Sequence, residues 1–204
     1  MVREGYLGQL SSVTRGLRKL KWYWLYRPDI ADNFVTDTID LDQIAKDLSR
    51  IQETLTDLTI EAGSYGWPSD IYMPPLHFNG SFNLSEIHML ERIEIPLPFM
   101  LGFSPSTSKM LHLGEALPKS LEWLTVTDDL CFQEEWEWNL DTFHLVGVLR
   151  SWLQDWRRFT PRLRGFCLSG EQDWQDEMLH GLEDLASEFG VQIRIIENGI
   201  TVFG

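Results

Sequence analysis

The stretch "LEWLTVTDDL", residues 121–130, carries the pattern that decides the fold. Leucine stands at its first and fourth positions and valine at its sixth, and paired aspartates follow. Apolar residues two positions apart predict a strand with one buried face, because successive side chains of a strand point to opposite sides. The stretch is therefore an isolated strand, one unit of a repeat, or a carboxylate site formed by Asp128 and Asp129.

The same pattern, with an apolar residue at positions one, four and six, recurs along the whole chain. It is found at 17–22, 55–60, 90–95, 121–126 and 163–168, and in degenerate form at 190–196, where Gly190 replaces the first leucine. Successive starts are 38, 35, 31, 42 and 27 residues apart, by subtraction of 17, 55, 90, 121, 163 and 190. Recurrence at intervals of similar size indicates a repeat architecture.

Helical patterns lie between several of these strands. Residues 41–53, 141–156 and 174–189 space their apolar side chains by three and four, which is typical of a helix with one buried face. Asp40 followed by Gln43 indicates the start of the first helix, and Gly190 is placed as the cap that ends the third. Residues 61–89 and 96–120 are richer in Pro, Gly and Ser, and they predict loops with short helical turns.

A unit of strand, loop and helix cannot bury its apolar face alone, so neighbouring units must stack. We therefore expect one α/β domain over residues 1–204, an irregular leucine-rich-repeat-like solenoid with about six units. Parallel strands would line the concave face of this horseshoe, with helices and loops on the convex face. The units are longer than the roughly 20–29 residues of common leucine-rich repeats, and they lack the asparagine that completes that pattern.

In this arrangement positions three, five and seven of each unit face the concave surface. The predicted partner-binding residues on these strands are Asp57, Thr59, Glu61, Arg92, Glu94, Trp123, Thr125, Thr127 and Arg194. The same strip is expected to expose Lys19, Lys21, Tyr23, Pro96, Gly165, Cys167, Ser169, Gln192 and Ile196. Trp136 and Trp138, in the acidic stretch 134–141, are either exposed binding anchors or half-buried against the next unit.

The charge distribution bears on the kind of partner. The net charge is −14, with +5 in residues 1–27 and therefore −19 in the rest. An acidic body repels phosphate backbones, so nucleic-acid binding is not expected. The acidic strip from Asp57 to Glu94 suggests a protein partner with a basic face. Residues 17–26, "LRKLKWYWLY", are apolar for the open end of a solenoid, which favours self-association there.

The sequence also bears on localisation. No apolar run is long enough for a membrane helix, and the first residues lack the apolar core of a secretion signal. The two cysteines, Cys131 and Cys167, are too few for a disulfide framework. These features favour a cytoplasmic or nuclear protein with reduced thiols and no membrane partner.

Motifs for chemistry are scarce. The chain has no Walker A run, no Gly-x-Gly-x-x-Gly and no Gly-x-Ser-x-Gly. Asp128 and Asp129 are more typical of a turn than of a catalytic pair, since Asp is a favoured turn residue. We therefore expect a non-catalytic protein without cofactor or metal. The alternatives are a free-standing repeat scaffold or assembly subunit and, less favoured, a metal-dependent hydrolase that uses Asp128, Asp129 and a histidine.

Three segments carry a family resemblance. They are "IAKDLSRIQETLTDLTIEAG" (44–63), "SEIHMLERIEIPLPFMLG" (85–102) and "LPKSLEWLTVTDDL" (117–130). They resemble the C-terminal leucine-rich-repeat region of filamentous-fungal F-box-domain proteins, over about residues 40–170. The resemblance implies the substrate-binding arm of an F-box-type ubiquitin ligase component. These residues hold no F-box segment, so we do not expect this chain alone to dock on the cullin-ligase adaptor.

Overall fold

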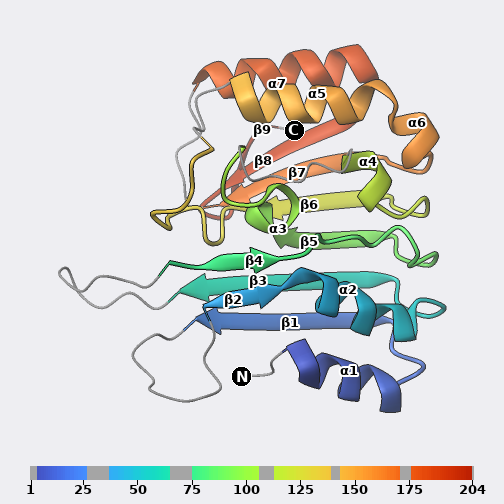
Figure 1. Ribbon diagram of the computed structural model, residues 1–204. Coiled ribbons are helices and arrows are strands. Elements are labelled where there is room, and N and C mark those ends of the chain that lie inside the picture. The colour runs from blue at the N-terminus through green and yellow to red at the C-terminus, as the bar shows by residue number, and fades with distance from the viewer. Residues whose placement is uncertain are drawn as a thin grey trace.

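A seven-stranded sheet forms the centre of the computed structural model, which describes residues 4–26, 37–64, 75–105, 113–138, 143–170 and 176–203. Six strands lie side by side in chain order and all parallel: β1 (Lys19–Tyr26), β3 (Asp57–Ser64), β5 (Arg92–Pro96), β6 (Trp123–Thr127), β7 (Gly165–Gly170) and β8 (Gln192–Glu197) (Figure 1). The seventh strand, β9 (Ile200–Phe203), is antiparallel to β8. The expected α/β class with a mostly parallel sheet is confirmed.

Each parallel strand begins two residues after the start of one sequence unit, as for 17 and Lys19 or 121 and Trp123. The register places the third residues of the units in one row across the sheet: Lys19, Asp57, Arg92, Trp123, Gly165 and Gln192. The backbone repeats one contact at each step. Thr56 N and Asp57 N donate to Arg18 O at 2.8 and 3.0 Å, and the equivalent pairs of N–H groups donate to the carbonyls of Thr56, Glu91 and Glu122. At the last step Gln192 N alone donates to Arg164 O, at 3.1 Å. The sequence repeat is thus also a repeat of register and hydrogen bonding.

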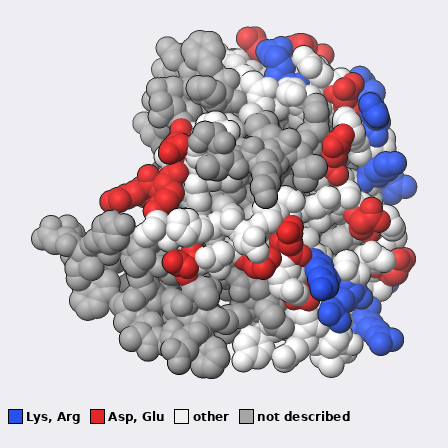
Figure 2. Space-filling view, viewed as in Figure 1, with Lys and Arg blue, Asp and Glu red and all other residues white. Residues whose placement is uncertain are grey.

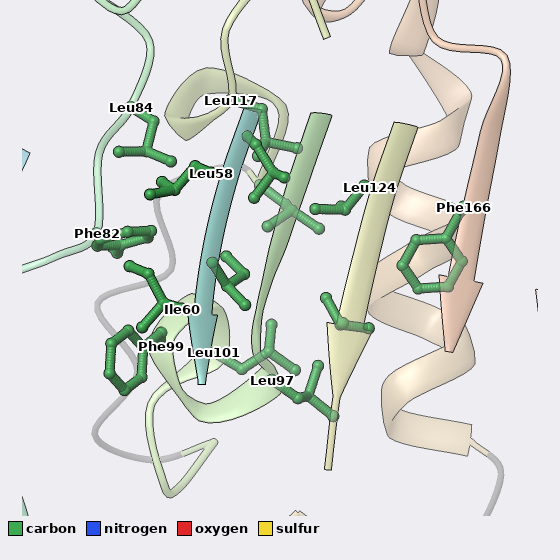
Figure 3. Packing of buried hydrophobic residues seen from close by; sticks show 14 of the residues in the cluster. Leu58, Ile60, Phe82, Leu84, Leu97, Phe99, Leu101, Leu117, Leu124 and Phe166 are labelled. Atoms are coloured by element: carbon green, nitrogen blue, oxygen red, sulfur yellow. The ribbon is translucent and has the colours of Figure 1, made fainter. Parts of the chain in front are cut away.

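The core lies on one side of this sheet. The fourth residues of the units are buried, and so are the sixth: Leu20, Leu58, Ile93, Leu124, Phe166 and Ile193, then Trp22, Ile60, Ile95, Val126, Leu168 and Ile195. They form one cluster with apolar residues of the helices and connecting segments. Figure 3 shows part of it: Ile60 of β3 lies close to Phe99, and Leu124 of β6 and Phe166 of β7 follow across the sheet.

Helices cover one face of the sheet (Figure 1). Their bounds are α1 (Glu4–Val13), α2 (Leu41–Leu48), η1 (Ser49–Ile51), α3 (Leu97–Leu101), α4 (Leu113–Ala116), α5 (Phe143–Gln154), α6 (Trp156–Phe159) and α7 (Asp176–Phe189). The three helices predicted from apolar spacing are confirmed as α2 with η1, α5 and α7. Asp40 caps α2, because its carboxylate accepts from Gln43 N at 2.8 Å, and Gly190 follows α7 with φ +64°.

Several elements differ from the sequence expectation. The short helices α3 and α4 fit the short helical turns predicted for 96–120, but the segment 61–89 also contains an unexpected strand, β4 (His77–Asn79), which pairs in parallel with β2 (Thr38–Asp40). Three to five residues are too few to show the apolar periodicity of a helix or strand, so the sequence pattern does not predict the bounds of such elements. α1 carries only a weak apolar stripe, and β9 follows an Asn198–Gly199 turn in which both residues have positive φ. Asn-Gly is the usual signal of such a hairpin.

Candidate functional site on the open face of the sheet

The face of the sheet opposite the helices carries the third, fifth and seventh residues of the units. The exposed side chains there are Lys19, Lys21, Tyr23, Arg92, Gln192 and Arg194. The half-buried ones are Asp57, Thr59, Glu61, Glu94, Trp123, Thr125, Thr127, Ser169 and Ile196. All the predicted strand residues of the partner site therefore share this surface, which we call the open face.

Pro96, Gly165 and Cys167 are corrections, because they are buried and not exposed as expected. At Gly165 the cause is the Trp123 indole, since a Cβ at Gly165 would lie 2.2 Å from Trp123 Cζ3. Pro96 ends β5 where the chain enters α3. At β7 the open face therefore exposes fewer residues than the alternation of inward and outward side chains predicts.

Trp123 and Arg194 form a platform across three strands. Trp123 on β6 lies opposite Gly165 on β7, and its ring occupies the space that a side chain at Gly165 would fill. The Arg194 guanidinium of β8 lies 5.0 Å from the centre of the Trp123 ring. A cation over an indole face is attracted by the ring quadrupole. Trp123 is thus held in place on this surface, where it is only partly exposed.

Ion pairs occupy the end of the open face near β1. Asp57 lies between Lys19 Nζ, at 3.7 Å, and Arg92 Nε, at 2.6 Å, and Lys21 Nζ contacts Glu61 Oε1 at 2.6 Å. Burial alone would raise the pKa of Asp57, but hydrogen bonds from Thr56 and Arg92 outweigh it, and the pKa lies below its ordinary value. The basic and acidic residues that the sequence places in this strip therefore largely neutralise each other.

Glu94 and Asp129 differ from these paired acids. Burial, followed by the charge of Glu61, raises the pKa of Glu94, although Lys21 opposes the shift. Burial is also the main cause of the raised pKa of Asp129. Within the described ranges neither carboxylate forms an ion pair with a basic side chain. The centre of the open face thus holds two half-buried acids whose charged form is disfavoured.

The role of Asp129 is not visible in the sequence. Asp128 turns the chain as predicted, since its carbonyl accepts from Cys131 N at 2.9 Å. The Asp129 carboxylate instead accepts from Ala62 N of β3 at 2.9 Å. β3 pairs with β5 only from Asp57 to Thr59, so the N–H of Ala62 lies beyond that pairing. Asp129 joins two strands that are not neighbours, and only tertiary structure shows this.

The other predicted aromatic anchors lie elsewhere. Trp138 is 3% exposed, and its Nε1 donates to Gly102 O at 3.0 Å. Trp136 is half-buried and packs against the core cluster. The sequence leaves open whether these tryptophans are exposed anchors or buried against the next unit. Trp138 is buried, so it cannot serve as an exposed anchor.

The structure also places the cysteines and the candidate metal ligands. Cys131 and Cys167 are buried free thiols, and burial raises the pKa of each. In the described parts of the chain, no three His, Cys, Asp or Glu side chains gather in a group suited to a metal ion. Asp128 and Asp129 therefore have no third ligand beside them among those residues.

Two further findings bear on how function can be assigned. None of the helices within the described residues has the length and apolar character needed to cross a membrane. Comparison with protein-family models, with curated proteins and with solved structures finds no match to this chain. The assignment of function therefore rests on the chemistry of the surfaces described here.

Proposed function

We propose that this chain is a protein-recognition module, a leucine-rich-repeat-like solenoid whose open face is the concave binding surface. Support for the solenoid comes from the strands in chain order and from the backbone contact that recurs between Arg18, Thr56, Glu91 and Glu122. Solenoids of this kind bind extended partner surfaces along the strands. The partner-binding residues are those of the open face.

The observation that carries the proposal is the state of Glu94 and Asp129. Both carboxylates are half-buried with raised pKa values and without an ion-pair partner among the described residues. Groups held in such a state cluster at functional sites, since burial disfavours their charge until a ligand compensates it. A lysine or arginine side chain of a partner would supply that compensation.

Aromatic side chains frame the same region. Trp123 is half-buried and held by Arg194, and Tyr23 is 53% exposed near the β1 end. Trp, Tyr and Arg are the residue types that most often dominate binding energy at protein interfaces. The proposed partner therefore presents a basic side chain flanked by apolar groups, in keeping with the basic face expected from the sequence.

A charge reversal on the open face tests this function. The immobilised wild-type chain is used to capture partners from an extract of its source cells. The variant Glu94→Arg is expected to capture its specific partner about tenfold more weakly, which corresponds to about 1.4 kcal/mol of binding free energy. Glu183→Arg on α7 makes the same charge change on an exposed helix position and should leave capture intact. Equal capture by both variants, each folded by circular dichroism, contradicts the proposal.

The family resemblance narrows the class of partner to a protein that other subunits of a ubiquitin ligase modify. The free-standing scaffold is the alternative. Mixing the purified chain with the cullin-ligase adaptor tests the ligase connection, because a stable complex, which is not expected without an F-box segment, would contradict the scaffold. The identity of the captured partner then decides: a partner that carries ubiquitin favours the ligase function, and one that does not favours the scaffold.

We also propose self-association through α1, which lies beside β1 at the end of the sheet (Figure 1). Tyr6, Leu10 and Val13 of α1 are 52%, 40% and 79% exposed, although all three are apolar or aromatic. We expect the double variant Leu10→Glu, Val13→Glu to have a smaller mass in sedimentation equilibrium than the wild type. Gln9→Glu, also exposed on α1, is the control that should not change it. A wild-type chain that is monomeric at every concentration contradicts this.

A further inference from the structure

A cavity of about 470 Å³ lies apart from the open face. It is formed by the residues around β4, by the end of α3 and by the segment that contains Glu135 and Glu137. None of the open-face residues lines it. Its volume falls within the roughly 300–1,000 Å³ typical of small-molecule sites.

Aromatic rings form one wall of the cavity. Phe78 is half-buried and stacks on Phe103, with ring centres 4.5 Å apart and ring planes 8° apart. Phe99 meets Phe78 edge-on at 5.5 Å and Phe82 at 5.8 Å. Figure 3 shows Phe82 and Phe99 side by side in this part of the molecule. Phe78 is the more accessible ring of the stacked pair, since Phe103 is 7% exposed, and it offers an apolar surface that suits a flat ring.

Acidic groups form the rim. Glu135 and Glu137 line the cavity, and no Lys or Arg is among the described residues that line it. Glu137 accepts a hydrogen bond from the Ser104 hydroxyl. Residues 128–138, "DDLCFQEEWEW", hold five acids and no Lys or Arg. Figure 2 shows acidic side chains gathered at the left of the helix-bearing face, where Figure 1 places this yellow segment. The cavity therefore opens where the charge is negative.

The rim is fixed to the aromatic wall. Glu137 N donates to Phe103 O at 2.8 Å, and Trp138 Nε1 donates to Gly102 O at 3.0 Å. These contacts tie the acidic segment to the residues that follow α3. A preformed rim reduces the ordering that a ligand must impose, and so favours binding.

We propose that this cavity binds a small aromatic amine. Its ammonium group would pair with Glu135 and Glu137, and its ring would pack against Phe78 and Phe103. Charge-assisted hydrogen bonds to carboxylates are about twice as strong as neutral ones, and aromatic faces attract cations. A neutral or anionic molecule of the same shape would lack the ion pair. The volume exceeds what one lysine side chain fills, which favours a free molecule over a partner's side chain.

Isothermal titration calorimetry with three indole compounds tests the proposal on the wild-type chain. Tryptamine carries an ammonium group, tryptophol is its neutral analogue and indole-3-propionate is an anion. We expect tryptamine to bind at least about tenfold more tightly than tryptophol, with no detectable binding of the anion. Equal affinity for all three, or no binding of tryptamine at millimolar concentration, overturns the proposal.

Neutral variants locate the site. Glu135→Gln and Glu137→Gln are each expected to weaken tryptamine binding about tenfold, whereas Glu134→Gln is the matched control, since Glu134 is exposed and does not line the cavity. An equal loss for Glu134→Gln would attribute the binding to general acidity and overturn the site. Partner capture by the open face should be unchanged in all three variants, which separates this inference from the proposed function.

Discussion

Replacing Phe166 by alanine is expected to lower the free energy of unfolding by about 3–5 kcal/mol, the range for a buried phenylalanine. Phe166 is 1% exposed on β7, where it lies between Leu124 of β6 and Ile193 of β8. Trp152 of α5 meets its ring edge-on, with ring centres 6.1 Å apart. The ring therefore joins the sheet to a helix, and hydrogen-bonded strands on both sides limit how far a cavity can collapse.

Urea unfolding followed by circular dichroism measures the change in Phe166→Ala. Phe132→Ala is the control, because Phe132 is 69% exposed and its removal should change stability by less than about 0.5 kcal/mol. If the two variants lose similar stability, or if Phe166→Ala loses less than about 1 kcal/mol, the ring is not the core contact described here.

The positions of the parallel strands were predictable because the core imposes them. The apolar pattern of Leu121, Leu124 and Val126 recurs in the other units, because the fourth and sixth residues of each unit face a shared core. The pattern also predicts which residues share the open face. It does not predict what covers them, and this is why Gly165, placed on the exposed side, is buried under Trp123.

The remaining features depend on contacts between segments distant in the sequence. The cavity is lined by Phe78, Phe103 and Glu137, and no spacing of residues in the sequence predicts that these three lie close together. The bond from Ala62 N to Asp129 joins residues 67 positions apart. Side-chain pairs of this kind carry no period, so they are found only once the strands have been placed in space.

Asp129 gives the second large effect, and two variants separate its hydrogen bond from its charge. Asp129→Asn keeps an acceptor for Ala62 N, whereas Asp129→Ala leaves that N–H without a partner in a part-buried place. An unsatisfied buried donor costs about 1–3 kcal/mol. We therefore expect Asp129→Ala to be less stable than Asp129→Asn by about this amount, at every pH, since neither variant titrates at residue 129. Equal stability of the two variants would show that the bond to Ala62 contributes nothing.

The free energy of unfolding of the wild type should contain a pH dependence from residue 129 that these two variants lack. Burial raises the pKa of Asp129 above its ordinary 3.8, so the protonated carboxyl favours the folded state. That contribution is complete below the ordinary value and is lost as pH rises through the raised one. Asp129→Asn should therefore gain stability relative to wild type between acidic and neutral pH, as measured by urea unfolding at each pH. A constant difference between them contradicts a raised pKa.

The same variant connects stability to the proposed function. If the charge of Asp129 serves to attract a partner's basic side chain, Asp129→Asn gains stability at neutral pH but captures less partner than wild type. Such opposite changes are the usual sign of a group kept for binding at the expense of folding. A variant that gains stability and captures as much partner as wild type would assign Asp129 to strand tethering alone, and would leave Glu94 as the acid that meets the partner.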